Sequence, residues 1–358
     1  MKINKKGILL AGLFCLSVML LSACGKKESK EIALIETEKT KSTEAVYGEL
    51  LRGIEVFAKT NRMDYQVIES KNNEKENCED AIKQAIKDGA KVIVLYGEKI
   101  SPAVYDMQLK HKRTEFLFFE GIPQNDKGKE KFRENTSSIY FKEQEAGFLA
   151  GYAAVAEGHR KLGFIESKSN KEAKEYGSGF VQGAELAAKV LNLGQGEVNI
   201  RYKRIENGNL SPVTSGLART WFSEGSEIIM TGEESLLDNV FIGAGGQENK
   251  KVIVAGDYQG ESTMIETWAK PDYAGAINYL LTAYKDKKLS GGEKMYLGIL
   301  EDGVGLSMDS STFQNFSREN YKGLIKAFKE KSYQVIADYV PGGDVSLETN
   351  LVTLSIEE

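Results

Sequence analysis

Short apolar runs alternate with amphipathic stretches along most of the chain, and this alternation restricts the fold more than any other feature. The runs at 32–35, 91–96 and 116–119 are apolar almost throughout, which is typical of strands buried on both faces. The stretches at 47–59 and 78–87 repeat apolar residues at helical spacing. The pattern therefore predicts an α/β fold in which helices cover both faces of parallel sheets.

The alternation begins again near residue 138, which predicts a second lobe. A chain of 358 residues is also too long for one small core. The five prolines are dispersed and no stretch rich in Pro, Gly or Ser separates two halves, so we expect several short crossovers rather than one flexible tether. The expected lobes are 32–137 with about 258–292, and 138–257 with about 293–358.

The remaining elements are predicted from the same two periodicities. The expected strands are 65–68, 138–141, 161–165, 198–202, 227–230, 252–255 and 295–300, and the expected helices are 103–110, 142–156, 176–191, 212–222, 236–242, 273–284 and 321–329. Two glycine-rich segments are predicted as turns: 243–246 follows a helix, and 289–293 precedes a strand. The second resembles the ABC ATPase signature, but the chain has no P-loop to accompany it.

The N-terminus has the features of an export signal. Three lysines precede the apolar run Gly7–Leu21, and two small residues then precede Cys24. This run is shorter than a comfortable membrane span, which needs about 20 apolar residues. Small residues before a cysteine at the end of such a run resemble the site where lipoproteins are cut and acylated. We predict a leader at 1–23, an acylated Cys24 and a polar stalk at 24–31, so that lipid holds the protein on the extracytoplasmic face of the cell membrane. The alternative is an uncleaved anchor with an incidental cysteine.

Composition narrows the range of functions. The net charge is −5, the pI is about 5.5 and no basic block is present, which argues against nucleic acid as a partner. Beyond Cys24 the one remaining cysteine is Cys78, so no intramolecular disulfide is expected. Its acidic neighbours should raise the pKa of its thiol, and we expect a packed or half-buried side chain. His111 and His159 adjoin Lys and Arg and are expected on the surface. We therefore predict no metal site, no cofactor and no enzymatic activity.

Several segments resemble one known family. Asn135–Ala154 is similar to the strand–helix signature of the basic membrane protein family of substrate-binding lipoproteins, in which a strand ending in Phe is followed by a Glu-rich turn and by Leu-Ala-Gly. The similarity continues, in the family's order, at 161–165, 176–183, 268–273 and 298–306. It spans nearly the whole chain after the leader.

The resemblance implies a two-lobed periplasmic-binding-protein fold of type I, with the ligand between the lobes. Better-known members of the family resemble purine-nucleoside receptors that feed ABC transporters, so a nucleoside-like ligand and an ABC permease are the implied partners. Physical principles fit this role. Ligands of open α/β sheets bind outside the carboxyl ends of the strands, and two lobes can close on a small molecule by a hinge motion.

The resemblance also implies which residues contact the ligand. Tyr47 lies at the helix start where the family has a stacking aromatic, although the family's Asp and Ser-Phe-Asn features are absent from 37–47, and a buried tyrosine is an equal alternative. Lys270 matches a lysine near the ligand, with a surface lysine as the alternative. The full implied set is Tyr47, the strand-end pair Tyr96 and Gly97, the aromatic Tyr176, the strand-end pair Thr231 and Gly232, the ribose-binding aspartate Asp257, and Lys270.

Three functions are compatible with these observations. The leading hypothesis is a receptor that captures a small solute and docks onto a permease, with the lipid raising its effective concentration there. The alternative is a sensory or regulatory lipoprotein that uses the same cleft to signal to a membrane partner. A third is an extracellular hydrolase, for which carboxylates are plentiful but no activated nucleophile or metal-ligand spacing is evident.

Overall fold

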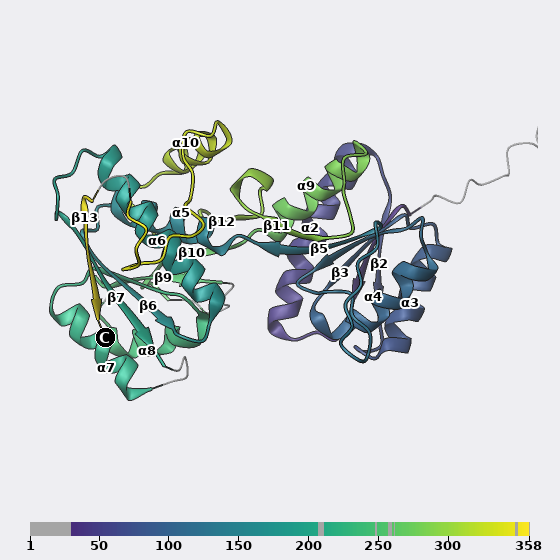
Figure 1. Cartoon of the computed structure of the whole chain (residues 1–358), viewed down its shortest axis with the longest axis horizontal. Coiled ribbons are helices and arrows are strands. Elements are labelled where there is room, and N and C mark those ends of the chain that lie inside the picture. The colour runs from purple at the N-terminus through teal and green to yellow at the C-terminus, as the bar shows by residue number, and fades with distance from the viewer. Residues whose placement is uncertain are drawn as a thin grey trace, which may run out of the picture.

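The computed structural model describes residues 30–357 apart from 207–210, 248, 257–259, 261, 348 and 349. Two α/β lobes lie side by side and are joined by several connecting segments of the chain (Figure 1). The predicted leader, Cys24 and Asp257 lie outside the described residues.

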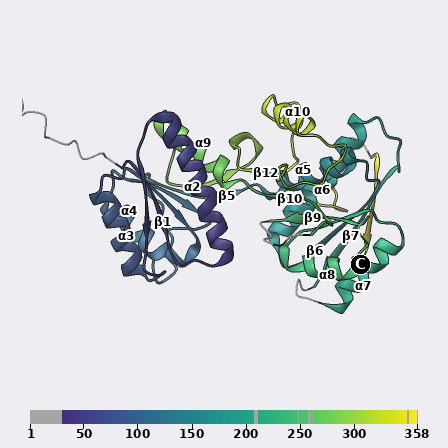
Figure 2. The same ribbon diagram turned by 180° about the vertical axis from the view of Figure 1, so that it is seen from behind.

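The first lobe is built on a six-stranded sheet in the order β11-β5-β4-β3-β1-β2, and all its neighbouring strands are parallel. The strands are β1 (Ile32–Glu36), β2 (Tyr65–Glu69), β3 (Val92–Tyr96), β4 (Glu115–Phe119), β5 (Thr136–Phe141) and β11 (Lys294–Leu297). Helices α2 (Lys41–Asn61) and α9 (Tyr273–Lys285) lie together on one face, and α3 (Lys75–Lys87) and α4 (Ser101–Lys110) cover the other (Figure 2).

Alternate residues of β1 explain why both faces are covered. Ile32 and Leu34 belong to the core under α2 and α9, whereas Ala33 and Ile35 belong to the core under α3 and α4. All four are fully buried. An apolar residue at every position of a strand therefore requires a helix layer on each side, as the sequence pattern predicted.

The second lobe contains a seven-stranded sheet in the order β12-β10-β9-β8-β6-β7-β13, in which only the β10–β12 pair is antiparallel. Its strands are β6 (Lys161–Ser167), β7 (Val198–Ile205), β8 (Ile228–Thr231), β9 (Lys251–Ala255), β10 (Ile265–Pro271), β12 (Val304–Leu306) and β13 (Val352–Glu357). Helices α5 (Glu143–Glu157) and α6 (Lys171–Val190) lie on one face, α7 (Pro212–Ser223) and α8 (Leu237–Ala244) on the other, and α10 (Arg318–Lys329) packs beside α5.

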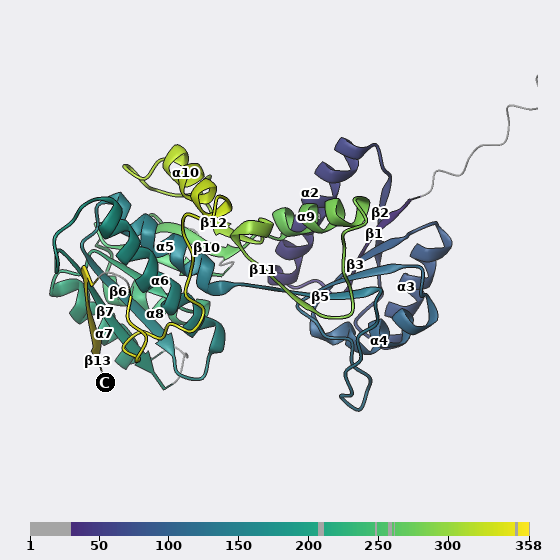
Figure 3. The ribbon, with the colours of Figure 1, turned by 45° about the horizontal axis from the view of Figure 1, so that its top comes forward.

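The chain passes between the lobes at three places, each directly after a strand: at Lys142 after β5, at Asp272 after β10, and at 298–303 after β11 (Figure 3). These crossings are tied to one another. A Glu145 carboxylate oxygen accepts a hydrogen bond from the Ile299 amide at 2.6 Å. The Asp272 amide donates to the Gly303 carbonyl at 2.8 Å. The joint between the lobes is thus a set of hydrogen-bonded segments.

These crossing points differ from the lobe boundaries expected from the sequence. The strand expected at 138–141 was predicted to open the second lobe, but the corresponding strand β5 pairs with β4 and β11 in the first sheet. Strand β11 was expected in the second lobe but pairs with β5 in the first sheet. Strand β10 lies in the stretch expected in the first lobe but pairs with β9 in the second sheet. The reason is that the first crossing joins the end of one sheet to the helix of the next, so the alternation continues across it without a break.

Most predicted elements are confirmed to within a few residues. Helix α6 begins at Lys171 rather than at the predicted residue 176, because the Asn170 side chain caps it by accepting from the Ala173 amide. The strand predicted at 295–300 ends at Leu297 and continues as a 3-10 turn over Ile299–Glu301. The glycine-rich segment at 243–246 ends α8 as predicted, with Gly245 in the left-handed region.

The cysteine prediction is confirmed and the prediction for one histidine is wrong. Cys78 is fully buried, and burial raises the pKa of its thiol, whereas the hydrogen bond from the Ser70 hydroxyl lowers it. The His159 side chain, expected on the surface, is only 17% exposed, and its Nε2 lies 3.5 Å from Glu266 Oε2. Within the described residues, no helix combines the length and the apolar character needed to cross a membrane.

Four glycines allow α5 and α6 to pack with their backbones almost in contact. A methyl group at Gly179 would lie 1.8 Å from the Gln144 carbonyl oxygen, and one at Gly151 would lie 2.0 Å from the Phe180 carbonyl oxygen. Gly147 and Gly183 are equally constrained. Such contacts with backbone atoms cannot be relieved by a side-chain rotation, so the helices must separate if a Cβ is added.

We therefore expect Gly179→Ala to lower the free energy of unfolding by about 2 kcal/mol or more, measured by chemical denaturation. The matched control is Gly216→Ala in α7, where an added methyl meets no atom within 4 Å. The control should be neutral or stabilising by up to about 1 kcal/mol, since alanine is the better helix former. Equal effects of the two substitutions would contradict the proposed close packing.

Candidate functional site

A cavity of about 500 Å³ lies between the two lobes. Its first-lobe wall includes residues that follow β3 and β4 and the end of β5, and its second-lobe wall includes residues that follow β8 and β9. The cavity is therefore bounded by the carboxyl ends of parallel strands in both sheets, the position at which open α/β sheets bind ligands. Its volume falls in the range of small-molecule sites.

Four of the residues implied by the resemblance line this cavity. Tyr96 and Gly97 end β3, Gly232 follows β8, and Tyr176 projects from the first half of α6. Gly97 has φ of +91°, a conformation that favours glycine and turns the chain at the cavity wall. The structure brings these four residues together from two lobes, and their contact with a ligand remains a prediction.

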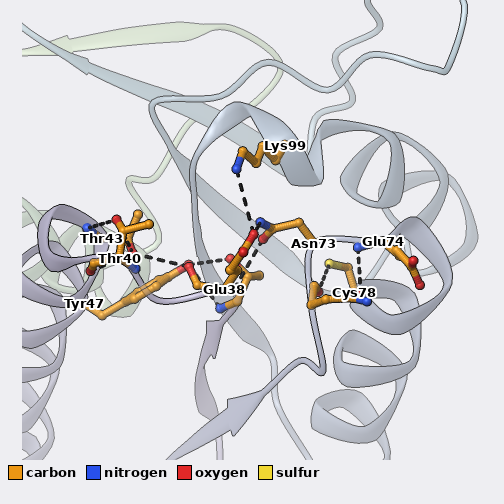
Figure 4. Close-up of polar contacts among 10 residues, drawn as sticks. Glu38, Thr40, Thr43, Tyr47, Asn73, Glu74, Cys78 and Lys99 are labelled. Atoms are coloured by element: carbon orange, nitrogen blue, oxygen red, sulfur yellow. Dashed lines mark hydrogen bonds and ion pairs between the residues drawn. The ribbon is translucent and has the colours of Figure 1, made fainter.

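Tyr47 does not line the cavity. Its side chain is 1% exposed, and its hydroxyl lies 2.9 Å from Thr37 Oγ1 and accepts from the Thr37 amide at 3.2 Å. The ring extends from α2 toward the segment that follows β1, beside Glu38 (Figure 4). It meets the Tyr96 ring edge-on at a centroid distance of 5.9 Å. The structure thus favours the buried-tyrosine alternative, in which Tyr47 supports Tyr96 from behind.

A reciprocal cap at the start of α2 fixes the direction of this helix. Thr40 Oγ1 accepts from the Thr43 amide at 3.3 Å, and Thr43 Oγ1 accepts from the Thr40 amide at 2.8 Å (Figure 4). Such a cap satisfies two backbone donors that a helix start leaves free. Because Tyr47 lies only one turn further along, the cap also sets where its ring enters the core.

Thr231 and Lys270 also lie outside the cavity lining. Thr231 is fully buried in β8. Lys270, at the end of β10, forms an ion pair with Glu49 of α2 in which Nζ and Oε1 are 2.6 Å apart. Lys270 and Glu49 border a separate cavity of about 530 Å³ between α2 and α10. Since β10 belongs to the second lobe and α2 to the first, this pair joins the lobes.

Asp257 lies outside the described residues, directly after Gly256, which lines the cleft.

The resemblance did not indicate Glu120, which is the best-positioned carboxylate of the cleft. It follows β4, has φ of +48°, and lines the cavity. Its Oε2 accepts from the Tyr96 hydroxyl at 3.3 Å, and its Oε1 accepts from the Tyr273 hydroxyl. Burial raises the pKa of this carboxyl group. A charged residue directly after an apolar strand was the sequence signal that could have identified it.

Other carboxylates converge on the same space. Glu143, at the start of α5, lines the cavity, and burial together with the neighbouring Glu175 holds the pKa of its carboxyl group well above the ordinary value. Glu233 Oε2 accepts from the Asn170 amide group at 2.9 Å. Its Oε1 is buried, and no hydrogen-bond partner for it exists among the described residues.

The lining combines aromatic rings with hydrogen-bond acceptors. Tyr96 and Tyr273 meet edge-to-face at 6.1 Å, and Phe141 meets Tyr273 in the same way at 5.0 Å. Tyr273 and Phe141 are buried and Tyr96 is half-buried, and an aromatic ring that borders a cavity is a surface on which a planar solute can stack. Carboxylates next to them can accept from hydroxyl, amide or ammonium groups. Within the described part of the chain, no cluster of three or more His, Cys, Asp or Glu side chains is placed to hold a metal ion.

Solved structures with the same architecture define the class of fold. An ABC transporter solute-binding protein from Conexibacter woesei superposes with a TM-score of 0.59 at 14% identity, covering 86% of this chain and 99% of that chain. AraP, an arabinose-binding protein from Geobacillus stearothermophilus, gives 0.52 at 12% identity, with coverage of 82% and 99%. A transcriptional activator of the comK gene from Bacillus halodurans gives 0.59 at 18% identity, with coverage of 85% and 99%. At these identities the similarity shows the fold alone, which is the type I periplasmic-binding-protein fold.

The sequence identifies the family within that fold. Residues 40–338 match the Bmp family, described as "ABC transporter substrate-binding protein PnrA-like". A relative, Basic membrane protein D of Borreliella burgdorferi (strain JD1), is 24% identical over 246 residues, which cover 64% of this chain and 65% of the relative. The match thus spans slightly less than two thirds of the length of that relative. The chain belongs to the Bmp family of ABC transporter substrate-binding proteins, as its motifs predicted.

Proposed function

We propose that this protein is a cell-surface lipoprotein that binds a purine nucleoside in the cleft between its lobes and delivers it to an ABC permease. The observation that carries the proposal is the cavity of about 500 Å³ at the carboxyl ends of both sheets. It offers the two kinds of group that a nucleoside needs. Tyrosine rings provide faces for the base, and carboxylates can accept hydrogen bonds from ribose hydroxyls.

The crossings between the lobes support a mechanism of capture by closure. All three lie at one joint, so the lobes can rotate about it while each sheet keeps its own core. A ligand that contacts both walls stabilises the closed arrangement, because those contacts are lost when the lobes separate. The permease would then recognise the closed form.

A panel of nucleosides, bases, sugars and amino acids tests the ligand class by thermal unfolding of the purified protein. A ligand present at about 100 times its Kd should add roughly 2.7 kcal/mol to the free energy of unfolding. We expect stabilisation by purine nucleosides, and we expect Asp257→Asn to abolish it if this residue binds ribose. The exposed Asp344 supplies the control substitution, Asp344→Asn, which should leave the effect unchanged.

Stabilisation by another solute class and by no nucleoside would contradict the proposed ligand while leaving the receptor function intact. If no member of the panel stabilises the protein, the regulatory alternative becomes the better hypothesis. An Asp257 variant that still responds fully would remove this residue from the site.

The lipid anchor is a separate proposal that rests on the sequence around Cys24. Metabolic labelling of the expressing cells with a fatty-acid analogue should label the protein, and Cys24→Ser should abolish the label because serine lacks the thiol that is acylated. Cys78→Ser is the matched control and should remain labelled, since Cys78 is buried in the first lobe. Labelling that survives the change at Cys24 would contradict the proposed anchor.

A further inference from the structure

The cleft has an unusual charge for this chain. Six glutamates line it, and no Lys, Arg or His is found among the lining residues that the structure describes: Glu98, Glu120, Glu143, Glu172, Glu233 and Glu234. The chain as a whole is nearly balanced, with 47 basic and 52 acidic residues. A surface drawn from that composition would carry both signs, so the cavity wall is specifically acidic. The glutamates come from both lobes and face one space.

The contacts of these glutamates include no basic side chain within the described cavity lining. The oxygens of Glu120 receive hydrogen bonds from two neutral tyrosine hydroxyls. Glu143 faces the carboxyl group of Glu175. Glu175 forms an ion pair with Lys171, and neither of these two residues lines the cavity. The buried Oε1 of Glu233 has no hydrogen-bond partner within the described residues. Carboxylates in a shared, partly dry space repel one another, and a positive charge placed among them removes that repulsion.

The aromatic part of the wall suits the same kind of ligand. Tyr96 and Tyr273 both bond Glu120 through their hydroxyls, and their rings stand nearly perpendicular, at 87°. A ring face attracts a cation, and a carboxylate beside the ring adds to the attraction. The pair of tyrosines and the carboxylate between them therefore form a corner that favours a planar or ammonium cation.

Glu120 is held in this corner with little freedom. A non-glycine residue at φ of +48° occupies a conformation that L-residues seldom adopt; here the Glu120 amide donates to the Ile139 carbonyl at 2.9 Å, and the two tyrosine hydroxyls hold the side chain. A carboxylate that is fixed before the ligand arrives loses little entropy on binding, which strengthens its preference for a matching charge.

We propose that the inter-lobe cleft selects its ligand by charge: it binds a cationic solute, with Glu120 as the principal anion that the positive group faces. The inference rests on the proposed receptor function and refines it. Among purine nucleosides it favours those whose base carries a positive charge, as N1-methylation of adenosine produces, over the neutral parent compounds. It excludes nucleoside monophosphates, because their phosphate would enter an acidic cavity.

Calorimetric titration of the purified protein at pH 7 tests the proposal with two isomeric ligands. 1-Methyladenosine is cationic and N6-methyladenosine is neutral, while both carry one added methyl group. We expect the cationic isomer to bind at least about tenfold more tightly, the factor that one charged contact in a partly dry site supplies. Adenosine monophosphate should show no binding, and spermidine, a cation without a base, should bind detectably.

Glu120→Gln keeps the shape of the side chain and removes its charge, so the ratio between the two isomers should fall toward one. Glu115→Gln, at the other end of β4, is the matched control and should preserve the ratio. Tighter or equal binding of the neutral isomer by the unaltered protein overturns the charge inference and leaves the nucleoside proposal intact. Binding of spermidine without any nucleoside supports the charge inference and overturns the nucleoside proposal. Failure of both cations to bind overturns the inference.

Discussion

The hydrogen-bonded joint between the lobes is the constraint on which the rest of this structure depends. Three segments cross there, and contacts such as Glu145 with the Ile299 amide hold them together. Because each crossing follows the carboxyl end of a strand, the two sheets present those ends toward a common space. The binding cavity is therefore a consequence of topology, and the side chains at the strand ends determine only what it binds.

Residues buried behind the cleft wall hold the residues that line the cleft in position. The cap at Thr40 directs α2, α2 places Tyr47 beneath Tyr96, and Tyr96 in turn bonds Glu120. Glu49 of the same helix pairs with Lys270 of β10. The same helix thus contributes to the cavity wall and to the contact between lobes, so a rotation that changes one also changes the other. This coupling gives ligand binding a physical route to the relative position of the lobes.

Much of this fold could be predicted from the sequence, because buried parallel strands and amphipathic helices have strong periodicities. The elements that escaped prediction lacked them. Strand β10 contains the buried polar residues Glu266 and Thr267, and β13 lies at a sheet edge where all its residues are half-buried or exposed. The lobe boundaries escaped for another reason: β5 has the composition of any buried strand, and only its pairing with β4 and with β11 shows which sheet holds it.

The candidate site was predictable where it follows from strand ends and not where it depends on side-chain partners. Tyr96, Gly97 and Gly232 end strands, and they line the cleft. The orientation of Tyr47 depends on Thr37, and the position of Lys270 depends on Glu49, 221 residues away in the chain. Neither partner is implied by local sequence. Glu120 satisfied the strand-end rule, but the family resemblance did not include it.

The central claim is that a solute bound between the lobes draws them together. Small-angle X-ray scattering of the purified protein, with and without its tightest-binding solute, tests this claim directly. We predict a smaller radius of gyration and a shorter maximum dimension in the presence of the solute, with unchanged mass. Saturating solute that binds yet leaves the scattering profile unchanged would contradict the account.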